Sequence, residues 1–123
     1  MAIVTKVKKS VRMELWTIVR FQLAFYCYLK GIVLTEQNLD CLTLLAITGE
    51  MELSDFCDKS AEQKIFKNAQ SVRTGLPLLE KKDLILTFKT GKNKKRLKLN
   101  PDIIVQTGGN ILLEYRIVRV ESN

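Results

Sequence analysis

The chain alternates between segments with a helical spacing of apolar residues and segments with a strand-like spacing. In residues 11–30, apolar side chains fall on more than one side of a helical projection, which predicts a long helix that Ser10 caps and Gly31 ends. A helix that is apolar nearly all round lies either in the centre of a core or against a second subunit. Because one small core cannot surround so long a helix, contact with a second subunit is a serious alternative.

Two shorter helices are predicted by the apolar spacing between residues 35 and 67. Thr35 is suited to cap the first of them, and Gly49 ends it. After a brief extended piece at residues 50–53, the second helix begins near Ser54. The interval 59–67 is longer than a compact interhelical turn, so it either extends this helix or adds a turn. The residues expected to face inward are Leu39, Leu42, Leu45, Ala46, Phe56 and Cys57.

A further helix is predicted over residues 68–82, directly before an apolar strand. Asn68 is suited to cap its start, because the side-chain oxygen can accept a hydrogen bond from an early backbone N–H. Gly75 and Pro77 lie inside it, and an interior proline removes one helical hydrogen bond, so we expect a kink or a shortened helix there. Its buried stripe consists of Val72, Leu76 and Leu79, while Gln70, Arg73 and Thr74 face elsewhere.

Past Asp83 the spacing of apolar residues becomes alternating, which indicates strands. A strand at 84–89, a turn at 90–94 and a returning strand at 95–99 form a hairpin, which Pro101 ends. The last long strand is expected to pair with the N-terminal segment or with a neighbouring subunit. The other expected elements are an extended N-terminal segment at 2–8, a short helix or strand at 103–105, a turn at 108–110 and the last strand at 111–120.

The composition is that of an ordinary globular chain, with 123 residues and 46% hydrophobic residues. This length fits one domain with a modest core. No apolar run reaches the roughly 18 residues that a membrane span needs. The basic N-terminus is not followed by a signal-type apolar segment and cleavage site, so we expect a cytoplasmic protein with no membrane partner.

The residues needed for metal binding and catalysis are scarce. The chain has three cysteines, Cys27, Cys41 and Cys57, and no histidine. An odd, widely spaced set of cysteines favours reduced, buried thiols over a disulfide framework, and the spacing does not match paired zinc ligands. Without histidine, the commonest general base and the Ser-His and Cys-His pairs are missing. We therefore predict a non-enzymatic protein with no cofactor and no metal.

The net charge of +7 is distributed unevenly along the chain. Residues 1–12 contain four basic residues and no acid, and residues 84–100 contain six basic residues and no acid. Residues 35–62 contain seven acids and only one basic residue, Lys59. This segregation indicates a dipolar surface that can meet a polyanion on one side. The alternative interpretation is that a Lys-rich hairpin keeps a sheet edge soluble.

The order of elements in residues 35–99, ending in Leu79-Glu-Lys-Lys-Asp-Leu-Ile85 and a Lys-rich hairpin, resembles winged helix-turn-helix proteins, the MarR-like kind in particular. The resemblance implies an α+β fold: a winged helix-turn-helix with an extra N-terminal helix and a C-terminal β-strand extension. We expect a single domain over residues 1–123. Its parts are an arm and long aromatic helix at 1–34, the winged-helix core at 35–99 and the strand extension at 100–123.

The resemblance also implies a function, namely binding of double-stranded DNA, as in a transcriptional regulator. Helix 68–82 would then lie in the major groove and the basic wing 89–98 against the adjacent backbone, although a kink at Pro77 would hinder insertion. The expected DNA contacts are Gln70, Ser71, Arg73, Thr74, Lys89, Lys92, Lys94, Lys95, Arg96 and Lys98. MarR-like proteins dimerise through a helix of the kind at 11–30, so the expected interface of a homo-oligomer is Leu15, Trp16, Ile18, Val19, Phe21, Phe25 and Tyr26.

A second hypothesis is a structural subunit of a larger assembly, such as a connector or tail ring of a bacteriophage particle. In that case the same fold serves protein–protein contacts, and the location is the virion. Small α+β folds are reused in such rings, which is an argument by analogy. Weak, sequence-blind binding to duplex DNA would favour this hypothesis over the first.

Overall fold

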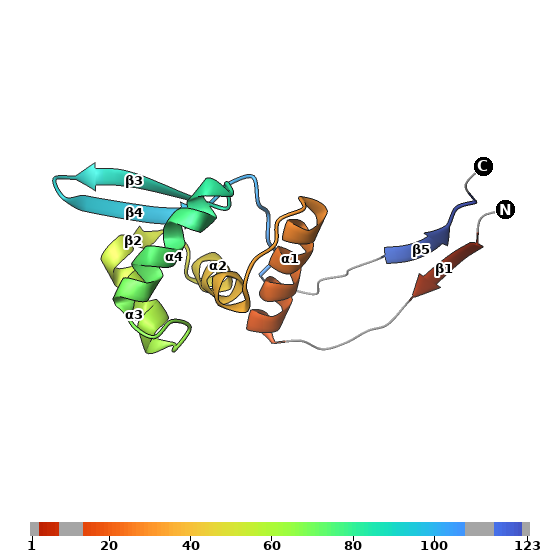
Figure 1. Cartoon of the computed structure of the whole chain (residues 1–123), viewed down its shortest axis with the longest axis horizontal. Helices are drawn as coiled ribbons and strands as arrows, with labels where there is room; N and C mark the ends of the chain where they lie inside the picture. Colours follow the sequence, from red (N-terminus) through yellow and green to blue (C-terminus); the bar gives the residue numbers. More distant parts are fainter. Residues whose placement is uncertain (1–2, 8–13, 108–114, 122–123) are drawn as a thin grey trace.

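The computed structural model describes residues 3–7, 14–107 and 115–121, and Figure 1 shows the order of their helices and strands. The strands form a two-stranded sheet with the order β1-β5 and a three-stranded sheet with the order β2-β4-β3. The helices are α1 (Leu15–Leu29), α2 (Glu36–Thr48), α3 (Leu53–Glu62) and α4 (Ala69–Lys81), and the strands are β1 (Ile3–Val7), β2 (Met51–Glu52), β3 (Ile85–Gly91), β4 (Lys94–Leu99) and β5 (Tyr115–Arg119).

Helix α1 begins later than the sequence predicts. Its N-cap residue is Glu14, in an extended conformation, and the first hydrogen bond of the helix joins Ile18 N–H to the Glu14 carbonyl at 3.0 Å. Glu14 therefore takes the cap position predicted for Ser10, and residues 8–13, Ser10 included, lie outside the described part of the chain. Gly31 ends the helix as predicted, because its φ of 69° lets Ile32 N–H reach back to the Cys27 carbonyl.

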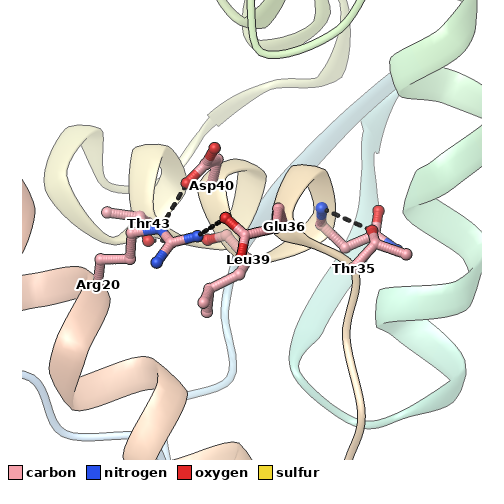
Figure 2. A network of polar contacts seen from close by, with 7 residues as sticks. Arg20, Thr35, Glu36, Leu39, Asp40 and Thr43 are labelled. Atoms are coloured by element: carbon pink, nitrogen blue, oxygen red, sulfur yellow. Dashed lines mark hydrogen bonds and ion pairs between the residues drawn. The ribbon is translucent and has the colours of Figure 1, made fainter.

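Helix α2 is capped at Thr35, whose side chain accepts a hydrogen bond from Asn38 N–H at 3.2 Å. The helix lies against α1, and the Arg20 guanidinium of α1 reaches two carboxylates of α2 (Figure 2). It donates to Asp40 at 2.6 Å and to Glu36 at 2.8 Å, and the hydrogen bond to Asp40 is the main cause of the raised pKa of Arg20. These contacts hold α1 against the rest of the fold.

Helices α3 and α4 form the helix-turn-helix. The cap of α3 is Glu52 and the helix begins at Leu53, near Ser54 as predicted, and its Phe56 and Cys57 are completely buried as expected. The turn contains Lys64 with a φ of 59°. Asn68 caps α4 by accepting a hydrogen bond from Ser71 N–H at 2.9 Å. The helix continues through Pro77 to Lys81, so the proline does not shorten it.

The three-stranded sheet contains the predicted hairpin of β3 and β4, with β2 on the other side of β4. Leu97 of β4 is completely buried and lies opposite Met51 and Thr87, so this face of the sheet packs on the helices. Asn93 turns the hairpin with a φ of 63°, a conformation that asparagine tolerates well. In Figure 1 the hairpin extends beyond the helices as a ribbon.

The segment after the hairpin returns to α1 without regular structure. Residues 103–105 form neither the predicted short helix nor a strand, although Ile103 is buried. At Gln106 the segment is bonded to α1: the Gln22 amide donates to the Gln106 carbonyl at 2.9 Å and accepts from Gln106 N–H at 2.8 Å. A side chain of α1 thus satisfies the backbone that a sheet would otherwise pair.

The two ends of the chain pair with each other. β1 and β5 are antiparallel, with Thr5 opposite Ile117, and lie side by side in Figure 1. Of the two partners predicted for the last strand, the N-terminal segment is the one observed. Residues 108–114, which include the predicted turn and the start of the predicted strand, lie outside the described part of the chain.

Buried side chains from all four helices, from β3 and β4 and from the segment after them form one core cluster. Val19 and Leu23 of α1 belong to it together with Phe56 of α3 and Val72 of α4. All three predicted stripe residues of α4 are buried, and Gly75 lies where a Cβ atom would meet Phe66 and Asn38 at 3.5 Å. This core fixes α4 and the hairpin relative to each other.

Candidate nucleic-acid interface

A concavity of about 500 Å³ lies between α4, the hairpin and the beginning of α3. Four of its lining residues are cations, Arg73 of α4 and Lys89, Lys94 and Lys95 of the hairpin, and one is an acid, Glu52. The remaining lining residues are Leu53, Ser54 and Asn93. The tertiary structure thus brings together cations from a helix and from a hairpin that are more than ten residues apart in the sequence, and the concavity has the electrostatic character of an anion site.

Lys89 and Lys95 form a directly opposed pair across β3 and β4. Both are exposed and both line the concavity. Like charges that face each other across an antiparallel pair destabilise the sheet. The pair makes no hydrogen bond or ion pair among those found for the described residues, and Glu52 is the one acid that lines the same concavity, so no direct contact within this part of the chain offsets the repulsion. A bound anion would offset it.

The exposed face of α4 carries the side chains predicted to contact bases. Gln70, Arg73 and Thr74 are exposed, and Ser71 is half-buried. The Ser71 hydroxyl donates to Asn68 Oδ1 at 3.2 Å, and the Thr74 hydroxyl donates to the Gln70 carbonyl at 3.0 Å. Arg73 and the Gln70 side chain have no such internal bond among the described contacts.

The remaining predicted cations of the hairpin differ in position. Lys92 is exposed at the tip and does not line the concavity, although the adjacent Asn93 does. Arg96 lies opposite Phe88 on the other face of the hairpin, because side chains alternate along a strand. Its Nε atom donates to Glu50 at 3.0 Å, and the ammonium group of Lys98 lies 5.7 Å from the centre of the Phe88 ring. Arg96 and Lys98 therefore already have partners within the chain.

Helix α1 presents a second apolar face to solvent. Phe21 and Phe25 are each 44% exposed, Tyr28 is 80% exposed, and Leu15 and Leu29 are also exposed. Three residues predicted to lie in an oligomer interface are only half-exposed and pack partly on the core: Trp16, Ile18 and Tyr26. Val19 was assigned to the same interface, but it is completely buried in the chain's own core, so that assignment is wrong.

The cysteines are all buried and unpaired, as predicted, and they do not line the concavity. Burial raises the pKa of Cys41 to about 12, and the neighbouring Cys57 adds to the shift. Burial also raises the pKa of Cys57, against a smaller opposing effect of Arg73. Among the residues that the structure describes, no group of three Cys, Asp or Glu side chains is placed to hold a metal ion.

Sequence reasoning missed four contributors to the concavity: Glu52, Leu53, Ser54 and Asn93. No local signal marks them, because each belongs to an element that the sequence assigned to structure alone. The pairing register of β3 and β4 could have shown from the sequence that Lys89 and Lys95 lie on one face of the hairpin, and Arg96 and Lys98 on the other. Counting back from the hairpin turn places the first two on one face and the other two on the opposite face.

No protein-family model and no curated protein matches this chain. A solved structure does share its fold. The ferric uptake regulator Fur of Helicobacter pylori, whose structure has three functional metal-binding sites, matches with a TM-score of 0.50 and 17% identity over 74% of this chain. The match covers 61% of the Fur chain. NadR in complex with 4-hydroxyphenylacetate matches with a TM-score of 0.44 and 18% identity, over 78% of this chain and 70% of the NadR chain.

The chain therefore has the winged helix-turn-helix fold predicted from its sequence, in the α+β class, with a helix added before it and a strand after it. In this fold α4 occupies the position of the helix that follows the turn, and the β3–β4 hairpin is the wing. The MarR-like kind stays a prediction. None of the helices that the structure describes has the length and apolar content to cross a membrane.

Proposed function

We propose that this protein is a non-enzymatic binder of double-stranded DNA. In this proposal α4 enters the major groove and the wing contacts the adjacent phosphate backbone. The concavity between them receives the backbone, where Lys89, Lys94 and Lys95 neutralise phosphates and Arg73 borders the α4 side. Arg96 and Lys98, which have partners on the other face of the wing, contribute to the general positive field and make no direct contact.

The observation that carries the proposal is the opposed pair Lys89 and Lys95 beside Arg73. Lysines that only keep a sheet edge soluble would be free to lie on the outer face or at the tip. Here Lys89 and Lys95 repel each other on the face of the hairpin that is turned toward α4, and this repulsion slightly lowers the stability of the fold. A row of phosphates would turn this repulsion into attraction.

We further propose that the protein acts as a homodimer through the exposed apolar face of α1. This face carries Phe21, Phe25 and Tyr28, which lie one turn apart along the helix, together with Leu29. Exposed aromatic side chains in such a stripe mark a protein–protein contact more often than a solvated surface. A dimer would present two copies of α4, which suits the two half-sites of a duplex target. A role in regulating transcription would follow from such a target.

Duplex binding across a salt series tests the proposal. We expect the logarithm of the binding constant to fall linearly with the logarithm of salt concentration, with a slope of about −0.9 for each neutralised phosphate. Lys89→Ala combined with Lys95→Ala should weaken binding to all sequences and reduce the slope by about 2.

The matched control is Lys98→Ala, which removes the same charge from the same strand but from the outer face. It should change the slope by less than half as much as either inner-face lysine. If Lys98→Ala and Lys95→Ala weaken binding equally, the concavity is not the contact. If no duplex binds at about 50 mM salt, where phosphate contacts are strong, the protein is not a DNA binder.

A further inference from the structure

The side chains on the exposed face of α4 are not equally free to contact DNA. We infer that each copy of α4 donates hydrogen bonds to only two base-pair positions, with Arg73 contacting a guanine and Gln70 an adenine, and that Ser71 and Thr74 donate to none. This inference rests on the proposed function. It assigns the sequence specificity of the interface to two residues, where the sequence had suggested four.

The hydroxyl groups of Ser71 and Thr74 are already in use. A hydroxyl has one hydrogen to donate. That of Ser71 goes to Asn68 Oδ1 at 3.2 Å, and that of Thr74 goes to the Gln70 carbonyl at 3.0 Å. Phosphate oxygens, guanine O6 and every purine N7 are acceptors and need a donor. Neither hydroxyl can therefore bind these groups without giving up its internal bond.

For Ser71 the internal bond is also part of the helix cap. Asn68 Oδ1 accepts both the Ser71 hydroxyl and the Ser71 backbone N–H, the latter at 2.9 Å. Rotating the Ser71 hydroxyl toward DNA would remove one of two donors from this oxygen. The polar side chains in the first turn of α4 thus stabilise the N-terminus of the helix.

Between Thr74 and Lys81, which ends the helix, the exposed face of α4 has little to donate. Pro77 lacks a backbone N–H, and Leu78 is apolar and 42% exposed. Glu80 accepts a hydrogen bond from Thr87 at 2.7 Å and carries a charge that phosphates repel. Apart from the capping amide of Asn68, Gln70 and Arg73 are the free donors in the first two turns of α4. They lie three residues apart and so project from neighbouring turns of one face.

The chemistry of these two side chains sets the expected preference. Arginine makes two hydrogen bonds to O6 and N7 of guanine, and glutamine makes two to N6 and N7 of adenine. Each such pair discriminates against a wrong base by about 5- to 150-fold. All other base pairs under one α4 should be replaceable with little effect. The interface would therefore recognise a short, purine-containing element, and most of its affinity would come from phosphates.

Selection of bound sequences from a randomised duplex pool tests the inference, using the full-length protein at about 100 mM salt. We expect two informative positions for each copy of α4. Arg73→Ala should abolish the guanine preference and Gln70→Ala the adenine preference. Thr74→Val, which keeps the shape of the side chain and removes its hydroxyl, should leave the motif unchanged and the affinity within about twofold. Circular dichroism of each variant verifies that it is folded.

Two results would overturn the inference alone. One is a changed motif in folded Thr74→Val. The other is a motif of four or more informative positions for each α4, with the salt slope of the wild-type protein intact. In both cases the protein still binds DNA, and only the assignment of the reading residues is wrong. Failure of the wild-type protein to bind any duplex in the salt series would overturn the proposed function, and this inference with it.

Discussion

The opposed lysines of the wing predict that one substitution changes stability and DNA affinity in opposite directions. Lys95→Gln removes one member of the pair but keeps a long polar side chain on the strand. In a directly opposed pair the Cβ atoms are about 5 Å apart. Flexible ammonium groups that avoid each other reach roughly 7 Å, where the repulsion in water is about 0.6 kcal/mol.

Salt reduces this repulsion in a predictable way. The Debye length is about 30 Å at 0.01 M and about 8 Å at 0.15 M ionic strength. The repulsion is then roughly 0.5 kcal/mol at the lower ionic strength and roughly 0.25 kcal/mol at the higher one. Lys95→Gln should therefore stabilise the free protein by about 0.5 kcal/mol at low salt, a rise of about 2 °C in Tm. The same variant should bind duplex DNA more weakly, with the salt slope reduced by about 0.9.

Urea unfolding at two salt concentrations, followed by circular dichroism, measures the change in stability. Lys98→Gln is the control, because Lys98 lies opposite Leu86 and has its ammonium group over the Phe88 ring. This substitution should destabilise the protein by about 0.5–1 kcal/mol through the lost cation–π contact. If Lys95→Gln lowers stability at 0.01 M salt, or if its effect does not shrink as salt is added, the argument from like-charge repulsion is wrong.

Three other predictions concern the framework that positions the interface. Asn68→Ala should destabilise the protein by about 1 kcal/mol in urea unfolding, because α4 loses its cap, and an unchanged midpoint would contradict the cap geometry. Arg20→Ala should cost about 1 kcal/mol or less, since its ion pairs with Asp40 and Glu36 are partly exposed, and the loss should decrease in salt. Burial raises the pKa of Cys41 to about 12, so the folded state holds this proton more tightly than the unfolded state, and stability should fall as pH rises from about 9 toward 12. The decline in stability should reach up to about 1.4 kcal/mol per pH unit, and it should be shallower in Cys41→Ala. Both proteins are measured under reducing conditions. Equal slopes of stability against pH in the two proteins would refute the effect of the buried thiol.

Local signals in the sequence were sufficient for most of the fold. The caps at Thr35 and Asn68, the stop at Gly31 and the buried stripe of α4 follow from interactions within one or two turns of chain. The predicted start of α1 was wrong, because the apolar pattern near Glu14 does not fix the residue at which a helix begins, and Glu14 is an extended N-cap. The predicted short element at 103–105 was wrong: these residues have no regular structure, and the backbone of the nearby Gln106 is bonded to the Gln22 side chain of α1.

The sequence determined the elements, their order, the winged-helix class and the segments that carry positive charge. These features depend on spacing and on residue type, which are properties of neighbouring positions. Only the tertiary structure decided which charges act together. The register of β3 and β4 places Lys89 and Lys95 toward Arg73 and assigns Arg96 and Lys98 to partners on the other face. A shift of one position along a strand moves a side chain to the opposite face of the sheet. The number of charged residues in a segment does not contain this information.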